Sequence, residues 1–282
     1  MASIREQRGD SPQSKKQLIL TQSGQLSTHQ AVNDPEPTTD QVKISLQEIA
    51  KKMRHCVPGL LLTRPDAEPR GYLYRDGEAP VLDPRHCPNL ARTKVRVVNA
   101  DTIGATIELA NNSTTLMPVC VLNMANAQLP GGGWMRGALA QEEALCYRTS
   151  LAFSLKRYYY PLPEREGIYS PRILVFRESI KNGHDWVDLR NPKGLSVAAV
   201  VSVGAVCRPA IIRDANGNER YVSSKDRALM EEKMRVILRM AARNRHRQIV
   251  LGAFGAGAFK NPKDEVAKMW KNVLLETEFA GG

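Results

Sequence analysis

Residues 118–143, PVCVLNMANAQLPGGGWMRGALAQEE, hold the pattern that decides the fold. The run from Pro118 to Met124 is almost continuously apolar, which is typical of a parallel strand buried on both faces. A turn of three glycines, Gly131 to Gly133, follows it, and a helical pattern begins near Ala138. A buried strand that leads through a glycine turn into a helix is a building unit of α/β proteins.

The same alternation of strands and helices extends outward from this stretch. Upstream, the pattern predicts a helix over 41–54 that Pro58 and Gly59 end, and then an irregular wrapping segment over 63–88, rich in Pro and Gly. The further expected strands are 94–99, 173–176, 197–203 and 248–253, and the expected helices are 102–110, 138–157, 224–244 and 262–278. This order predicts one three-layer α/β domain with helices on both faces of a mixed central sheet.

Composition separates a tail from this domain. Residues 1–40 contain five acidic and four basic side chains and no aromatic residue, amid Ser, Gln, Thr and Pro, which is typical of a disordered segment. The whole chain has 40 Lys and Arg against 29 Asp and Glu, a net charge of +11, so the basic excess belongs to the remainder. We expect a disordered N-terminal tail at 1–40 and a folded domain at 41–282.

The sequence patterns exclude integral membrane proteins and secreted proteins. No window approaches the roughly 18 consecutive apolar residues of a membrane-spanning helix, and the N-terminus lacks a secretory pattern, so we expect a cytoplasmic or nuclear protein with no membrane contact. The five cysteines include no Cys-x-x-Cys pair, and neither His55-Cys56 nor His86-Cys87 has the spacing of zinc ligands. We therefore expect reduced thiols and no metal.

Two adjacent carboxylates follow the first glycine turn. Glu142 and Glu143 fall in the first turns of a helix, where the helix dipole favours negative charge, so a pair of surface acids is one interpretation. Adjacent helical residues point about 100° apart, so one carboxylate can also hold a substrate hydroxyl while the other transfers a proton at a glycosidic oxygen. The glycines themselves suit either a tight turn without a ligand or a cradle for a diphosphate.

A second glycine-rich turn follows the expected strand at 248–253. Its sequence, Gly252 to Phe259, reads GAFGAGAF and precedes a helix, an arrangement that favours anion binding. It matches neither Gly-x-Gly-x-x-Gly nor a Walker loop, which argues against dinucleotide oxidoreductases and ATPases. We expect Phe254 in the core, whereas Phe259 either joins the core or covers a sugar ring.

Together these motifs resemble the microbial-type (bacterial and fungal) poly(ADP-ribose) glycohydrolases of the macrodomain superfamily. The resemblance rests on Leu122 to Asn126, the Gly131 to Gly133 turn, Gln141-Glu142-Glu143, and Gly252 to Phe259, and Tyr169-Ser170-Pro171 with Phe176-Arg177 is similar to a further family stretch. It extends over most of residues 42–282. It implies a three-layer α/β/α macrodomain-like fold with a mixed central sheet.

The resemblance also implies an activity and a site. The activity is hydrolysis of the ribose–ribose O-glycosidic bond of poly(ADP-ribose), which releases ADP-ribose without a metal or a cofactor. Glu143 would be the general acid/base, and Glu142 would bind the ribose hydroxyls beside the scissile bond. The implied substrate-binding residues are Asn126 at the terminal ribose, Phe259 stacked over the ribose, Gly131, Gly132, Gly133, Gly255, Ala256, Gly257 and Ala258 at the diphosphate, and Gln141.

The implied partners are poly(ADP-ribose) or ADP-ribosylated proteins, and we expect a monomer that binds nucleic acid only non-specifically. The chain departs from the family at Ala256, where Cys is common, a change between small residues that should leave the turn intact. It also ends at Gly282 after a helix, where the family normally continues into a further strand, so we expect a catalytic domain truncated at its C-terminus.

Two other functions are also consistent with the sequence. One is a macrodomain that binds ADP-ribose without hydrolysis, and the other is a basic protein that binds nucleic acid. Arg235, Arg239 and Arg243 lie four residues apart on one expected helix. Such a row is either a solvated helical face or a surface for an acidic polymer.

Overall fold

The computed structural model of the chain describes residues 17–21, 39–67, 69–86 and 93–280. Seven strands form one sheet in the order β2-β5-β6-β4-β9-β1-β3. Their bounds are Gln17–Thr21 (β1), Tyr72–Tyr74 (β2), Lys94–Val98 (β3), Val119–Met124 (β4), Gly167–Leu174 (β5), Val197–Val203 (β6) and Ile249–Gly252 (β9). Strand β4 is parallel to β6 and β9, β1 is parallel to β3 and β9, and β5 is antiparallel to β2 and β6. The sheet is therefore mixed, as the sequence predicts.

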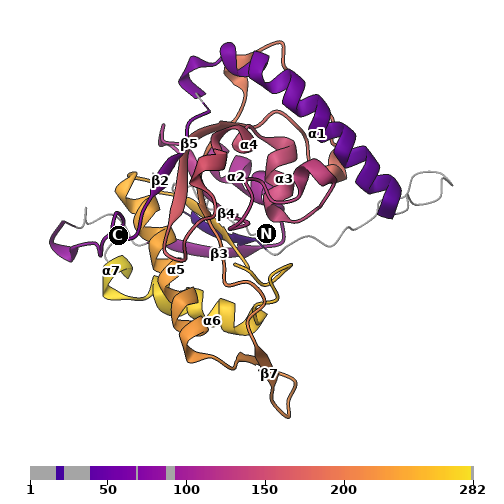
Figure 1. Ribbon diagram of the computed structural model, residues 1–282. Helices are drawn as coiled ribbons and strands as arrows, with labels where there is room; N and C mark the ends of the chain where they lie inside the picture. The colour runs from indigo at the N-terminus through magenta and orange to yellow at the C-terminus, as the bar shows by residue number, and fades with distance from the viewer. Residues whose placement is uncertain (1–16, 22–38, 68, 87–92, 281–282) are drawn as a thin grey trace, which may run out of the picture.

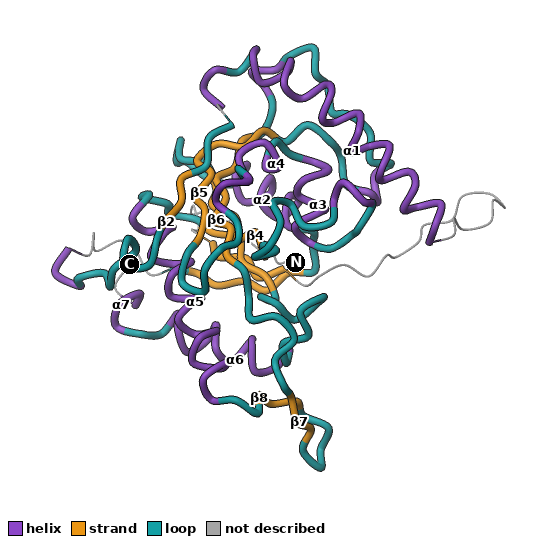
Figure 2. The backbone as a smooth tube through the Cα atoms, viewed as in Figure 1, coloured by secondary structure: helices purple, strands orange, loops and turns teal. Residues whose placement is uncertain are grey.

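Helices cover both faces of this sheet (Figures 1 and 2). On one side lie Thr39–Leu62 (α1), Thr102–Asn111 (α2), Gln141–Arg148 (α3) and Leu151–Ser154 (α4), and on the other lie Ser224–Arg243 (α5), Lys263–Leu274 (α6) and Thr277–Ala280 (α7). A separate hairpin joins Ile211–Arg213 (β7) to Glu219–Tyr221 (β8).

Strand β4 shows how the two layers of helices share the sheet. Val119 and Val121 belong to the core beneath α1, α2 and α3, whereas Cys120 and Leu122 belong to the core beneath α5 and α6. Because successive strand residues face opposite sides, a continuous apolar run is what a strand between two cores requires. The three-layer α/β/α architecture expected from the sequence is confirmed.

Helix α1 is longer than expected. It continues through Pro58 to Leu62, although the sequence predicts an end at Pro58. Pro58 removes one backbone donor, but it lies on the exposed side of the helix, where the freed carbonyl can be hydrated. The buried stripe of Met53, Val57 and Leu61 continues past it, so packing outweighs the proline.

The expected helix over 138–157 is broken, and the neighbouring strand is shifted. α3 ends at Arg148, and Thr149 takes extended dihedrals and forms a bridge with Val175. The N–H of Ser150 then donates to the carbonyl of Leu174 at 3.0 Å. Strand β5 accordingly covers Gly167–Leu174 rather than 173–176, with a register shift beside Pro171, where a strand tolerates proline.

Two segments expected to be irregular contribute strands. β2 lies inside the wrapping segment 63–88 and pairs with β5. β1 lies inside the expected disordered tail, between β9 and β3, so the prediction of disorder over 1–40 is wrong for Gln17–Thr21. The rest of that prediction, apart from Thr39 and Asp40 in α1, falls outside the described residues. Within the described ranges, no helix is both long and apolar enough to cross a membrane.

Candidate active site

The site lies where three parallel strands end. β4, β6 and β9 run in the same direction, so the segments that follow Met124, Val203 and Gly252 meet at one edge of the sheet. A Cβ built on Gly204, after β6, would lie 3.1 Å from the Cβ of Ala127, after β4, and a Cβ on Gly255, after β9, would lie 2.6 Å from that of Ala205. The two glycine-rich turns are therefore joined by the segment that follows β6.

Gln141 fixes the start of α3 against this edge. Its Nε2 donates to the carbonyl of Leu122 at 2.8 Å, and its Oε1 accepts the N–H of Met124 at 2.9 Å. Nε2 also lies 3.4 Å from the hydroxyl of Thr102 at the start of α2. The amide of Gln141 thus continues the backbone pairing of β4 and ties the start of α3 to that strand.

Glu142 is buried beneath the first glycine turn. Its Oε2 accepts the N–H of Asn126 at 2.8 Å, and its Oε1 accepts Nδ2 of Asn123 at 3.2 Å. Burial raises the pKa of Glu142 to about 8, against the opposing effect of these donors and of the Gly131 N–H, because desolvation penalises the charged form more strongly. Burial therefore favours the protonated form of Glu142 near neutral pH.

Glu143 lies on the same turn of α3 in a different environment. Its Oε1 accepts the N–H of Gly133 at 2.8 Å, and its Oε2 accepts the N–H of Ala140 at 3.2 Å, the latter being the reciprocal half of a capping box. The adjacent acids thus have distinct partners, as residues about 100° apart on a helix should.

The first glycine turn is shaped around these two carboxyl groups. Gly132 has a φ of +58°, and a Cβ there would lie 2.4 Å from Oε1 of Glu143 and 3.0 Å from Oε2 of Glu142. All three N–H groups of the turn have acceptors within the protein: Gly131 interacts with Glu142, Gly132 donates to Leu129, and Gly133 donates to Glu143. The turn first serves to hold the carboxyl groups, and its contact with a diphosphate stays a prediction.

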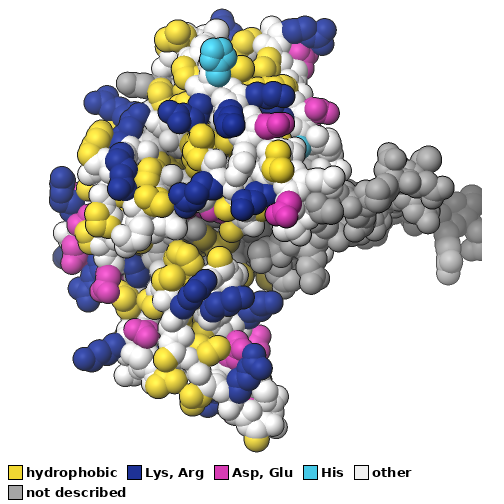
Figure 3. Space-filling view, turned by 45° about the vertical axis from the view of Figure 1, so that its right-hand side comes forward, with side chains coloured by type: hydrophobic (Ala, Val, Ile, Leu, Met, Phe, Trp, Pro, Cys, Tyr) yellow, Lys and Arg dark blue, Asp and Glu magenta, His cyan; other side chains and the backbone are white. Residues whose placement is uncertain are grey.

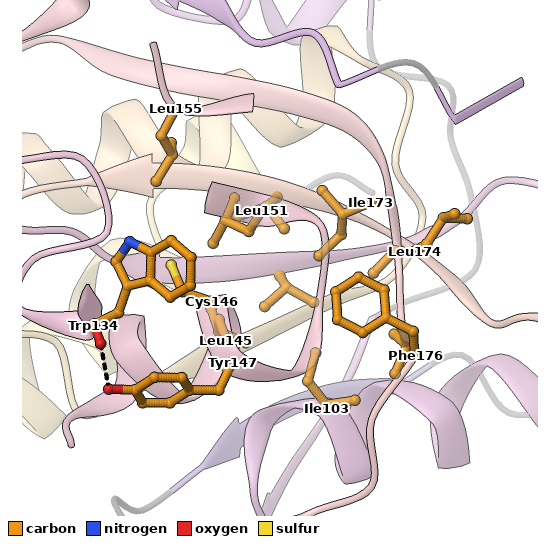
Figure 4. Close-up of a cluster of buried hydrophobic side chains, with 14 of the residues drawn as sticks. Ile103, Trp134, Leu145, Cys146, Tyr147, Leu151, Leu155, Ile173, Leu174 and Phe176 are labelled. Atoms are coloured by element: carbon orange, nitrogen blue, oxygen red, sulfur yellow. Dashed lines mark hydrogen bonds between the residues drawn. The ribbon is translucent and has the colours of Figure 1, made fainter. Parts of the chain in front are cut away.

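A buried aromatic pair packs against the first glycine turn. Trp134 packs edge-on against Tyr147 at a centroid separation of 6.2 Å, and the Tyr147 hydroxyl donates to the Trp134 carbonyl at 2.7 Å (Figure 4). Tyr147 lies one helical turn after Glu143, so the contact fixes the glycine turn relative to α3. A Cβ on Gly131 would lie 2.6 Å from the Trp134 ring, which explains why this position is glycine.

The second glycine turn has a different arrangement of donors. Ala256 donates its N–H to Ala253, but the N–H groups of Gly257, Ala258 and Phe259 have no acceptor in the part of the chain that the structure describes. Gly257 and Ala258 are exposed, and Phe259 is half-buried against the core beneath α5 and α6. Free donors ahead of a helix N-terminus suit an anion.

Asn261 holds this turn in place, a role that the sequence analysis missed. Its Nδ2 donates to the carbonyls of Val206 and Gly255 at 2.8 and 3.0 Å, and its Oδ1 accepts the hydroxyl of Tyr221 at 2.9 Å. Asn123 was missed in the same way. The only signal was a polar residue at the end of an apolar strand, which must find hydrogen-bond partners when it is buried.

Asn126 lies beside Glu142, to which its backbone N–H donates. Its Oδ1 accepts the N–H groups of Gln128 and Leu129 at 2.8 and 3.0 Å, and its Nδ2 has no partner among the described residues. It is half-buried, so this amide remains accessible. Phe254, in contrast, is fully buried against Trp270, as expected.

The row of arginines on α5 is not a free surface. Arg239 is almost fully buried and donates to both oxygens of Glu278 at 2.7 and 2.9 Å, and Arg235 does the same to Glu276 at 2.8 Å for each oxygen. Of the row, only Arg243 is exposed and lacks an ion pair among the described residues. Both interpretations of the row as one continuous face are thus wrong, because two of its members bind the C-terminal segment. Other Lys and Arg side chains are spread over the face shown in Figure 3.

A separate cavity of about 650 Å³ lies between α1 and residues 177–186. Leu46, Ile49, Arg177 and Trp186 are among its lining residues, and no expected site residue is among them. The cavity therefore does not belong to the site at the sheet edge. Within the described ranges, no group of three or more side chains could hold a metal ion.

Paired carboxyl groups beside glycine turns at one edge of an α/β/α sheet form an arrangement that can cleave a glycosidic bond. A family model described as microbial-type PARG, catalytic domain, matches residues 28–178, just over half of the chain. The chain belongs to this family, the microbial-type poly(ADP-ribose) glycohydrolases. No curated protein matches it.

Solved structures give the same fold. A poly(ADP-ribose) glycohydrolase from Thermomonospora curvata is similar over 84% of this chain and 91% of that chain, with 24% identity and a TM-score of 0.65. An enzyme of the same name from Deinococcus radiodurans, in complex with ADP-ribose, is similar over 79% of this chain and 87% of that chain, with 26% identity and a TM-score of 0.60. The resemblance seen in the sequence is confirmed.

Proposed function

We propose that this chain hydrolyses poly(ADP-ribose) with Glu143 as the group that transfers the proton and Glu142 as the group that holds the ribose. The observation that supports this most is the convergence of both carboxyl groups on Gly132 at the ligand-binding edge of the sheet. Each carboxyl group has its own donors, so the two can perform separate tasks. The relative from Deinococcus radiodurans was solved with ADP-ribose, the product expected here.

The reaction needs one proton to move in each direction. As the bond between the ribose C1″ and the 2′-oxygen of the neighbouring unit breaks, Glu143 protonates that oxygen, and positive charge develops on the sugar. Water then adds its hydroxyl to C1″ and returns a proton to Glu143. In this sequence Glu143 acts first as a general acid and then as a general base.

Glu142 is suited to the neighbouring role. Burial raises the pKa of its carboxyl group to about 8, which favours the neutral form near pH 7, and the group is held by Asn126 and Asn123. A neutral carboxyl can both donate to and accept from ribose hydroxyls. Asn126, with a free amide, would contact the same ribose.

The second glycine turn would take the diphosphate. Its free donors at Gly257, Ala258 and Phe259 face no acceptor in the described protein, whereas the donors of Gly131 to Gly133 already have one. We therefore assign the diphosphate chiefly to residues 255–258, with Phe259 over the ribose. We further propose that the chain acts as a monomer, in the cytoplasm or nucleus, on poly(ADP-ribose) or ADP-ribosylated proteins, and binds nucleic acid only non-specifically.

The direct test is to incubate the purified chain with poly(ADP-ribose) and to measure free ADP-ribose by chromatography. Release of ADP-ribose is the expected result. Salt-resistant ADP-ribose binding without release would favour a binding macrodomain. Affinity for any polyanion that falls steeply with salt, without release, would favour a nucleic-acid-binding protein.

A further inference from the structure

Four non-glycine residues of the described chain have a left-handed backbone: His184, Arg208, Arg245 and Lys260, with φ of 56°, 50°, 61° and 57°. Two of these, Arg208 and Lys260, adjoin the second glycine turn. The N–H of Arg208 donates to the carbonyl of Phe259 at 2.8 Å, and Lys260 is the next residue along the chain. Two long cationic side chains therefore start from neighbouring, strained backbone positions.

Ordinary helix termination explains the left-handed backbone of Arg245. Arg245 follows the C-cap of α5, and its N–H donates to Ala242 at 2.8 Å while that of His246 donates to Ala241 at 3.1 Å. A left-handed residue is common at this place in a helix ending. Arg208 and Lys260 follow no helix, and glycine would satisfy either position at lower conformational cost.

Both side chains are exposed, and neither has a hydrogen bond or ion pair in the described part of the chain. An independent observation points to an anion at the same place. The N–H groups of Gly257, Ala258 and Phe259 lack acceptors among the described residues, and α6 begins at Lys263 with no side-chain cap. The first turn of α6 carries Asp264 and Glu265, so the helix N-terminus itself does not favour an anion. The free backbone donors beside two unpaired cations do favour a phosphate.

We propose that Arg208 and Lys260 form a phosphate-binding pair at the rim of the second glycine turn. This inference rests on the proposed function, which places the substrate diphosphate at this turn. The phosphate is either that of the ADP-ribose unit in the site or that of the neighbouring unit of the polymer. Both sources offer the same chemistry, and the two can be distinguished by measurement.

The test compares glycine and methionine variants. Lys260→Gly and Arg208→Gly remove a cation and also relieve the backbone, so the melting temperature should rise while affinity falls. Lys260→Met removes the charge but keeps the strain, so affinity should fall by a similar factor with no gain in stability. Arg245→Gly is the matched control, because it relieves the same conformation and removes a cation elsewhere, and it should leave binding unchanged.

ADP-ribose affinity is measured by calorimetry, and KM by turnover of poly(ADP-ribose), each at low and high salt. The double glycine variant should lose about threefold to tenfold in affinity at low salt and show a weaker salt dependence. Loss of ADP-ribose affinity assigns the pair to the bound unit, and a raised KM for the polymer alone assigns it to the neighbouring unit. If the wild type binds ADP-ribose and all variants match it with both ligands, the phosphate-binding pair is refuted. Absence of ADP-ribose release by the wild type would instead refute the proposed function and leave the calorimetric comparison decisive.

Discussion

The carboxylate of Glu143 accepts the N–H of Gly133 at 2.8 Å, across the turn from the helix that bears the acid. The other oxygen accepts the N–H of Ala140, at the start of that helix. The proposed acid/base is therefore held by the two ends of one connecting segment. Any change that moves this segment should move the carboxyl group, and a misplacement of 1 Å costs about 100-fold in rate in enzymes.

Gly132→Ala should test this arrangement directly. A methyl group there would lie 2.4 Å from Oε1 of Glu143, and φ is +58°, so the turn and both carboxyl groups must shift. We expect kcat to fall by about 100-fold or more with the protein still folded. Gly217→Ala is the control, because φ is +81° but nothing lies within 4 Å of the added methyl group. Equal turnover by the two variants would show that Gly132 does not position the acids.

Glu142 should make the stability of the protein depend on pH. Burial raises its pKa from 4.5 to about 8 in the folded state, so between these values the folded state holds a proton that the unfolded state has lost. The free energy of unfolding should therefore fall as pH rises from about 4.5 to 8, at a rate of up to about 1.4 kcal/mol per pH unit from this group. Urea titrations across this range measure the effect.

Glu142→Gln isolates this contribution, since the amide does not titrate and the histidines are common to both proteins. The variant should gain stability relative to the wild type as pH rises from 5 to 8, whatever their difference at pH 5. Parallel stability curves for the two proteins over this range would mean that Glu142 is ionised in the fold.

Arg239 should contribute to stability rather than to attraction of the polymer. Its guanidinium is almost fully buried and binds Glu278 in α7 and Glu232 in α5. Arg239→Met leaves the half-buried carboxylate of Glu278 without its ion pair, although the N–H of Leu82 still donates to it, and should cost about 1–3 kcal/mol of unfolding free energy. Arg243→Met, at the exposed end of the same row, should cost less than about 1 kcal/mol. A stable Arg239→Met protein whose kcat/KM falls only at low salt would restore the steering role.

The sequence predicts the layers of the fold because its apolar patterns are long. Strand β6 lies at 197–203 as expected, and α5 at 224–243 differs from the expectation by one residue. The errors occur where tertiary contacts outweigh local signals. Pro58 lies on a solvated face, and Thr149 leaves its helix to pair with Val175, and neither outcome is visible in a local pattern.

The sequence likewise predicts some features of the candidate site and misses others. Glycine spacing and the Gln141-Glu142-Glu143 string predict which residues meet at the sheet edge. They do not reveal that Gln141 is used by the backbone of β4, or that the donors of Gly131 to Gly133 are used by the protein itself. Hydrogen-bond partners distant in sequence decide these roles, as they do for Asn261.

Turnover of poly(ADP-ribose) by Glu143→Gln, measured beside its affinity for ADP-ribose, tests the central claim most directly. Glutamine keeps the size and accepting oxygen of the side chain but has no proton to transfer. We expect release of ADP-ribose to fall by about 100-fold to 10,000-fold, with calorimetric affinity within a few-fold of the wild type. Near-normal release of ADP-ribose by Glu143→Gln would contradict the account and remove Glu143 from the reaction.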